Sequence, residues 1–201
     1  MAIIQTRRTQ GGSMRRLIVF NNISLDGYFT GAGGDFSWAK DGMDDSEFSA
    51  FVAGNASGEG ELLFGRVTYE MMASFWPTPA AKAAMPEVAA GMSRSRKDVF
   101  SRRLTKADWQ NTRLIKGELV AEARKLKQEE GPGMAILGSG SITSQLAAAD
   151  LIDEYQFVVN PVVLGTGRTM FEGLAKPLPM RLTESRAFKN GKLFLRYIPA
   201  R

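Results

Sequence analysis

The stretch ILGSGSITSQL, residues Ile136–Leu146, joins an apolar segment to a polar one through two glycines. The residues MAILG, 134–138, are short and almost entirely apolar, which is typical of a strand buried on both faces. Gly138 and Gly140 allow a tight turn, and SITSQLAAAD, 141–150, is predicted to form the helix that follows. A strand, a glycine turn and a helix in this order indicate an α/β sheet.

The same alternation runs along most of the chain. Strands are predicted at 15–24, 61–65, 96–101 and 112–116, and helices at 44–56, 66–76 and 117–131, with a broken helix at 80–92. After residue 150 strands predominate, at 151–165 and in a hairpin over 179–199 that turns at Asn190–Gly191. We therefore expect an α/β fold with a mixed, mostly parallel sheet and an antiparallel C-terminal edge.

The chain of 201 residues is short enough for one domain, which we place at 14–201, after a flexible N-terminal extension at 1–13. It contains no cysteine and no histidine, which excludes a thiol nucleophile, a Ser-His-Asp triad and a Cys/His zinc site. No apolar run approaches the roughly 20 residues that span a bilayer. The net charge is +5, but the basic residues are scattered, which disfavours nucleic acid as a partner.

Two predicted strand-to-helix turns carry groups that suit a phosphate. Gly65 ends a buried strand, and Arg66 and Thr68 fall in the first turn of the next helix, where free backbone N–H groups favour an anion. A second turn directly follows the strand at 96–101, and its hydroxyl and doubled guanidinium suit a dianion such as the 2′-phosphate of NADP: Ser101, Arg102 and Arg103. A capped helix and a solvated basic loop are the plainer alternatives.

The glycine turn of the opening stretch is the third such junction. Ser139, Ser141 and Thr143 add hydroxyls to its backbone N–H groups. Thr143 replaces the third glycine of the usual dinucleotide fingerprint, so a turn needed only for packing is an open alternative. Ligands of open α/β sheets collect at the carboxyl ends of the strands, and three such turns together favour one extended, multiply anionic ligand.

Five motifs in this order resemble the dihydrofolate reductase-like superfamily, in the branch of the C-terminal reductase domain of the bifunctional riboflavin-biosynthesis deaminase-reductase. They are FNNISLDGYF (20–29), LLFGRVTYEMM (62–72), VFS (99–101), ILGSGSI (136–142) and DLIDEYQFVVNPVVLGTG (150–167). The similarity extends from Arg15 to Pro199. It implies a three-layer αβα fold around a mixed sheet, with NADPH lying across the carboxyl ends of the central strands.

By this resemblance the three turns hold the cofactor. Its phosphate would lie on Gly65, Arg66 and Thr68, and its 2′-phosphate near Ser101 and Arg102. The pyrophosphate would contact Gly138, Ser139, Gly140, Ser141 and Ile142. The deaminase half of the bifunctional enzyme needs zinc-bound His and Cys, which this chain lacks. The reductase half usually has a glutamate before two glycines, and Gly138-Ser139-Gly140 departs from that pattern, which weakens the assignment of its phosphoribosylamino-pyrimidinone substrate.

Three carboxylates are candidates for catalysis. Asp26 in SLDGYF would lie at the mouth shared by nicotinamide and substrate, or would simply form a turn with Gly27. Asp45 and Glu47, with Asp44 beside them, lie in the region where dihydrofolate reductases carry the carboxylate that orients the pterin, although capping of a helix explains them equally well.

A loop behind Asp26, through Gly34, is a candidate lid. Phe36 and Trp38 would stack on a flat heterocycle or pack in the core.

The function expected is that of an NADPH-dependent reductase of a small heterocycle, either a pterin or a pyrimidine precursor of riboflavin. The cofactor carries the hydride chemistry, and no metal is required. A nucleotide- or flavin-binding protein without turnover is the alternative on the same fold. We further expect a cytoplasmic protein and a homodimer, with no nucleic-acid or membrane partner.

Overall fold

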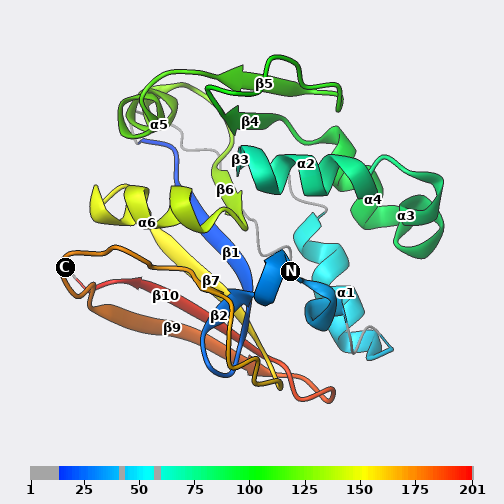
Figure 1. Ribbon diagram of the computed structural model, residues 1–201. Coiled ribbons are helices and arrows are strands. Elements are labelled where there is room, and N and C mark those ends of the chain that lie inside the picture. Colours follow the sequence, from blue (N-terminus) through cyan, green and yellow to red (C-terminus); the bar gives the residue numbers. More distant parts are fainter. Residues whose placement is uncertain (1–13, 41–43, 57–59, 201) are drawn as a thin grey trace.

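The computed structural model describes residues 14–40, 44–56 and 60–200 of the chain. Its centre is an eight-stranded sheet with the order β5-β4-β3-β6-β1-β7-β10-β9 (Figure 1). The strands are β1 (Leu17–Ser24), β3 (Glu61–Gly65), β4 (Lys97–Phe100), β5 (Thr112–Ile115), β6 (Met134–Leu137), β7 (Glu154–Asn160), β9 (Met180–Ala187) and β10 (Leu193–Pro199). A second sheet pairs β2 (Tyr28–Thr30) with β8 (Arg168–Thr169).

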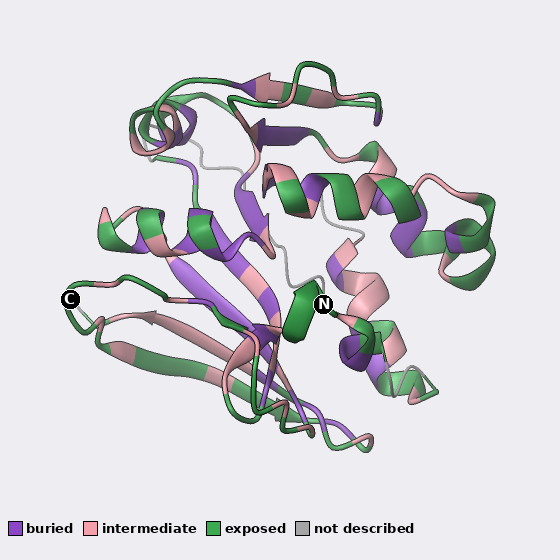
Figure 2. Ribbon diagram, viewed as in Figure 1, coloured by how far each residue is buried: buried purple, intermediate pink, exposed green. Residues whose placement is uncertain are grey.

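The six strands from β5 to β7 are parallel, so their carboxyl ends lie along one edge of the sheet. β10 pairs antiparallel with β7 and with β9, which forms the antiparallel C-terminal edge. The mixed, mostly parallel sheet predicted from the sequence is therefore confirmed. Figure 2 shows buried central strands and an exposed β9, as expected for an edge strand.

Helices cover both faces of the sheet, which gives the three layers predicted (Figure 1). They are α1 (Ser46–Ala56), α2 (Arg66–Phe75), α3 (Pro79–Ala84), α4 (Pro86–Arg94), α5 (Leu119–Gln128) and α6 (Gly140–Ala148). On one face Leu17 and Val19 of β1 pack against α5 and α6. On the other face Ile18 packs against α2 and α4, because successive side chains of a strand point to opposite faces.

Several local predictions can be compared with the structure. The broken helix is α3 and α4, which Met85 separates, and the Asn190–Gly191 turn joins β9 to β10. The single strand expected over 151–165 is shorter, because β7 ends at Asn160 and Pro161 follows. The extension predicted at 1–13 lies outside the described residues. Among the helices that the structure describes, none is long and apolar enough to cross a membrane.

Candidate functional site

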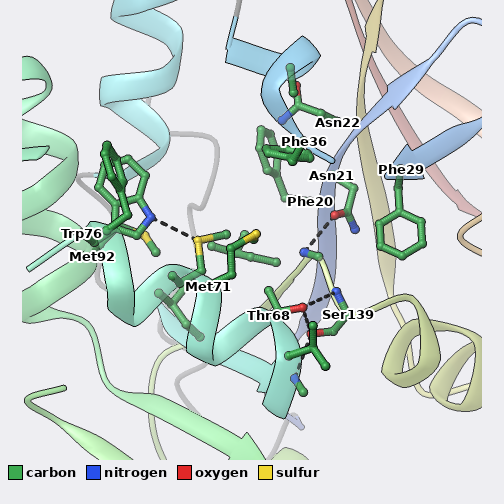
Figure 3. A pocket seen from close by; sticks show the side chains of 18 of the residues that line it. Phe20, Asn21, Asn22, Phe29, Phe36, Thr68, Met71, Trp76, Met92 and Ser139 are labelled. Carbon is green, nitrogen blue, oxygen red and sulfur yellow. Dashed lines mark hydrogen bonds between the residues drawn. The ribbon is translucent and has the colours of Figure 1, made fainter. Parts of the chain in front are cut away.

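A cavity of about 1570 Å³ opens at the carboxyl ends of the central strands. α1, α2 and α4 contribute one side of it, and the turns after β3, β4 and β6 contribute the other. All ten residues predicted to hold the cofactor line this one cavity: Gly65, Arg66, Thr68, Ser101, Arg102, Gly138, Ser139, Gly140, Ser141 and Ile142. The three turns therefore converge, as an elongated ligand requires. Figure 3 shows the region around Thr68 and Ser139.

Hydrogen bonds connect the first turn to the third. The Ser139 backbone N–H and hydroxyl donate to Thr68 Oγ1 at 3.1 Å and 3.0 Å. The backbone N–H of Gly65 donates to Ser139 Oγ at 2.8 Å (Figure 3). Ser139 itself adopts a left-handed conformation with φ 58°, which is uncommon for a residue other than glycine. The two turns are thus joined by hydrogen bonds, and the side chains of Thr68 and Ser139 bond to each other.

The glycines of the third turn are required by close neighbours. Gly138 has φ +63°, and a Cβ there would lie 2.9 Å from Thr68 Cγ2. A Cβ on Gly140 would lie 2.7 Å from the ring of Phe29. The Gly138 N–H donates to Asn21 Oδ1 at 2.8 Å. Contacts of this fold therefore explain why positions 138 and 140 are glycines.

The start of α6 keeps backbone donors available. Within the part of the chain that the structure describes, no hydrogen bond is formed by the N–H groups of Gly140 and Ser141. Both residues line the cavity, and α6 begins at Gly140. Free N–H groups and the positive end of the helix dipole together suit an anion such as a diphosphate.

The second turn places a hydroxyl and a guanidinium on the cavity wall. Ser101 Oγ accepts hydrogen bonds from the N–H groups of Arg103 and Leu104 at 3.2 Å and 2.9 Å, which shapes the turn. Arg102 is exposed and lines the cavity, whereas Arg103 is not part of the lining. Glu118 also lines this end, where the N–H groups of Ala121 and Val120 lower the pKa of its carboxyl. A cation and an anion therefore both face the end where the adenosine part was predicted.

The remaining half of the cavity is apolar and rich in aromatic rings and sulfur. Its wall includes Phe20, Phe36, Phe48, Met71, Met72, Trp76, Met85 and Met92 (Figure 3). Phe36 thus lines the cavity, and its stacking on a flat heterocycle stays a prediction. Trp38 packs edge-on against Phe36 at 5.6 Å between ring centroids, but it is buried outside the lining and belongs to the core. Such a wall suits a planar, largely apolar group.

Asp26 lies outside the cavity lining, and its carboxylate is occupied by the surrounding chain. It accepts hydrogen bonds from the Ser24 hydroxyl at 2.6 Å and from the N–H groups of Gly165 and Leu164 at 2.7 Å and 3.2 Å. These bonds lower the pKa of Asp26 to about 2. The contacts connect the β1–β2 turn to the loop after β7. They favour the turn role, and a catalytic role stays a prediction without a contact to support it.

The acidic residues before and within α1 also lie off the cavity lining. Asp45 Oδ1 accepts from the N–H groups of Glu47 and Phe48, and Asp45 Oδ2 accepts from the N–H of Asn190, so Asp45 caps the helix. Glu47 pairs with Arg186 at 2.6 Å on the surface. The contacts of Asp45 and Glu47 are thus structural, and their assignment to catalysis stays a prediction.

Sequence reasoning missed several polar residues on the wall, among them Asn21, Asn22 and Asp35. The two asparagines interrupt the apolar pattern of β1 just before its end, which was a readable signal. Asp35 accepts hydrogen bonds from the backbone N–H and the hydroxyl of Ser37, and these lower the pKa of its carboxyl. The described residues contain no cluster of acidic side chains that could hold a metal ion.

Residues 15–194 match the profile of the RibD C-terminal domain. The uncharacterized protein YyaP of Bacillus subtilis (strain 168) is 26% identical over 190 residues, which is 94% of this chain and 97% of YyaP. A crystal structure of a candidate riboflavin biosynthesis protein from Shewanella sp. PV-4 is similar with a TM-score of 0.70 and 24% identity, over 92% of this chain and 99% of that one.

Dihydrofolate reductase from Enterococcus faecalis, solved with NADP(H), has a similar fold, with a TM-score of 0.63 and 14% identity over 92% of this chain and 97% of that one. This likeness confirms the dihydrofolate reductase-like fold that the sequence predicts. The profile match covers most of the chain. The chain therefore belongs to the RibD C-terminal domain family.

Proposed function

We propose that this protein is an NADPH-dependent reductase of a small planar heterocycle, of the pterin or riboflavin-precursor pyrimidine type. The observation that carries the proposal is that the strand-to-helix turns after β3 and β6 converge with the loop after β4, which leads to β5, on one cavity that is apolar at its other end. Membership of a reductase-domain family and the NADP(H) held by the Enterococcus faecalis neighbour support it.

The polar half of the cavity would bind the cofactor. The open N–H groups of Gly140 and Ser141 would hold the diphosphate, with Thr68 and Ser139 keeping the turn in place. Ser101 and Arg102 would contact the 2′-phosphate. When bound, NADPH supplies the hydride. The protein's part is then to fix the two rings face to face and to exclude water.

The apolar half would take the substrate ring. Met71, Met72 and Trp76 on one side and Phe36 on the other form walls suited to a flat heterocycle. The proton that completes the reduction would come from bound water. Asp35 is the carboxylate on this wall nearest in sequence to the predicted lid, and its hydrogen bonds favour the ionised form, which does not donate protons at neutral pH.

A nucleotide-binding protein without turnover is the second candidate, because the three carboxylates predicted for catalysis lie off the cavity. Two measurements separate it from the reductase. Fluorescence titration with NADPH, NADP⁺ and NADH tests cofactor binding, and loss of NADPH absorbance over a panel of pterins and aminopyrimidines tests turnover. Tight binding with oxidation of at least one substrate supports the reductase, whereas tight binding with no oxidation supports the alternative.

The homodimer and the cytoplasmic location remain predictions. The proposed dimer would use the antiparallel edge formed by β9 and β10, where Leu182 and Leu193 are exposed. Sedimentation velocity of the purified chain would test it, and a single monomeric species at micromolar concentration would contradict it. Absence of salt-dependent duplex binding would agree with the expectation that nucleic acid is not a partner.

A further inference from the structure

Three polar side chains lie in a row on the face of the sheet that α1 covers. They are Lys192, which directly precedes β10, Asn160 at the end of β7, and Asn22 of β1. Lys192 and Asn160 are 3% and 1% exposed, whereas Asn22 is half-buried and lines the cavity. The row therefore runs from the buried interior to the wall of the proposed active site.

The chemistry of Lys192 decides how Asn160 is oriented. The Lys192 ammonium donates to Ala39 O at 3.1 Å and to the side-chain oxygen of Asn160. An ammonium group has donors only, so the atom of Asn160 that faces it must be the oxygen. The nitrogen of Asn160 then faces the other way, where it donates to Val158 O at 3.0 Å and to Ile23 O and Asn22 Oδ1, each at 3.2 Å.

The orientation of Asn160 in turn decides that of Asn22. Because Asn22 Oδ1 accepts from Asn160, the amide nitrogen of Asn22 points away from this partner. Within the described ranges no hydrogen bond is formed by Asn22 Nδ2, and its residue lines the cavity (Figure 3). The cavity wall thus carries an N–H₂ donor whose direction is determined by a buried cation two residues away in the network.

We infer that Asn22 Nδ2 donates a hydrogen bond to a carbonyl oxygen on a planar ring at the reacting end of the cavity. The inference rests on the proposed function, which brings two such rings together there. The oxygen belongs either to the carboxamide of the nicotinamide or to a ring carbonyl of the substrate. Asn22 is the binding residue, and Lys192 and Asn160 are positioning residues that act through it.

The surroundings strengthen this donor. Phe20 and Phe36 line the same cavity, and hydrogen bonds gain strength where water is excluded. The Lys192 ammonium also polarises the Asn160 amide, which polarises Asn22 in the same sense. Such a wall selects a ring that offers an acceptor and disfavours one that offers an amino group at that position, because two donors would then face each other.

The test compares three probes on the full chain and on Asn22→Asp, which keeps the shape and the bond from Asn160 but removes the donor. 2′,5′-ADP lacks the nicotinamide ring, NADPH contains its carboxamide, and lumazine, added to protein saturated with NADP⁺, offers ring carbonyls. We expect the Kd of 2′,5′-ADP to change less than about twofold and that of NADPH or lumazine to rise about tenfold or more. An effect on NADPH assigns the oxygen to the cofactor, and an effect on lumazine alone assigns it to the substrate.

Asn160→Asp provides a test that leaves Asn22 itself unchanged. An aspartate at 160 still accepts from Lys192 but offers Asn22 only an oxygen, so the Asn22 amide turns over and presents its own oxygen to the cavity. An aspartate at 160 also loses the bonds to Val158 O and Ile23 O, so the comparison uses a variant that melts like the wild type. In such a variant the Kd of the same probe should rise as in Asn22→Asp, which a purely structural role of Asn22 does not explain. Gln110→Glu, an equal change of charge outside the cavity lining, is the control for all three probes.

The outcomes separate the two proposals. If the wild type binds neither NADPH nor 2′,5′-ADP, the proposed function fails, and this inference fails with it. If the wild type binds both, but neither NADPH nor lumazine responds to Asn22→Asp in a variant that melts like the wild type, the inference alone is overturned. A change in 2′,5′-ADP binding equal to that in NADPH binding also overturns it, because the loss would then be unspecific.

Discussion

The two ends of the parallel strands use polar groups in opposite ways. At the amino ends the buried Arg15 donates to Glu61 at 2.7 Å, and Arg113 forms two bonds of 2.7 Å and 2.8 Å with Asp98. At the carboxyl ends backbone donors of α6 are open and the exposed Arg102 faces a cavity. Charges that are mutually paired stabilise the fold, whereas donors without partners are available to a ligand. The same residue types thus have different roles because of the strand end at which they lie.

The largest effect is expected from breaking the ion pairs at the amino ends. At about pH 8, where Glu61 is ionised, Arg15→Met should leave the Glu61 carboxylate buried without its closest partner and lower the free energy of unfolding by about 3–5 kcal/mol. Urea unfolding measures this loss. The control is Arg66→Met at the other end, where an exposed pair with Glu70 should contribute under about 1 kcal/mol. Equal losses in the two variants would contradict the contrast between the ends.

A pH dependence follows from the same cluster. Burial and the neighbouring Asp98 carboxylate raise the pKa of Glu61 to about 7 from 4.5. The folded protein therefore holds this proton more tightly than the unfolded chain, so the contribution of Glu61 is most favourable below pH 4.5. It is lost as pH rises to about 7, by up to about 3 kcal/mol. Urea unfolding at a series of pH values should show this slope, and Glu61→Gln should flatten it.

Asp98 acts in the opposite direction and at lower pH. Burial favours a higher pKa for Asp98, but the hydrogen bonds from Arg113 hold this pKa below its ordinary value of 3.8. Its contribution is present above pH 3.8 and is lost only as pH falls further. The two windows are thus distinct. A stability that rises between pH 5 and pH 7 in the wild type would contradict the assignment of Glu61.

At the carboxyl ends the matching prediction concerns binding. Arg102→Ala should raise the Kd of NADPH about 10- to 100-fold and leave the Kd of NADH nearly unchanged, because a hydrogen-bonded charge pair with the 2′-phosphate is lost. Glu118→Gln should have the opposite effect and lower the Kd of NADPH by less than about fivefold. It removes from the same wall a negative charge that repels the 2′-phosphate. Titration of both cofactors into both variants checks this, and an equal loss of NADPH and NADH in Arg102→Ala would refute it.

A smaller effect than that of Arg102→Ala is expected from the connection between the turns. Thr68→Val keeps the shape but leaves the Ser139 N–H without an acceptor, so the third turn should loosen. We expect NADPH affinity to fall by about three- to tenfold, with a loss of stability of about 1 kcal/mol. Thr68→Ser, which keeps the acceptor, should restore both values. Failure of the serine to restore binding would show that the methyl group, and not the oxygen, matters.

The sequence was informative wherever one local pattern determines the outcome. The glycine turn at Gly138 and the strands that flank it were predictable, because buried parallel strands are uniformly apolar and turns need small residues. The convergence of the three turns followed from the parallel order of their strands. The order of the strands in space, and the sheet of β2 and β8, depend on contacts between distant residues that no local pattern encodes.

The catalytic candidates show what residue type and sequence position do not predict. Asp26, Asp45 and Glu47 were selected by residue type and position, but their hydrogen-bond partners are residues 139 and 145 positions away, or a turn formed nearby. Asn22 interrupts the apolar pattern of β1, but the network that orients it includes Lys192, which is distant in sequence and reaches it through Asn160. Networks of this kind are visible only after the chain is folded.

The most direct measurement is a crystal structure of the protein with NADPH bound. We predict the diphosphate within hydrogen-bond distance of the N–H groups of Gly140 and Ser141, the 2′-phosphate beside Arg102, and the nicotinamide between the glycine turn and the apolar half of the cavity. A cofactor bound elsewhere, or the same cavity empty at saturating NADPH, would contradict this prediction.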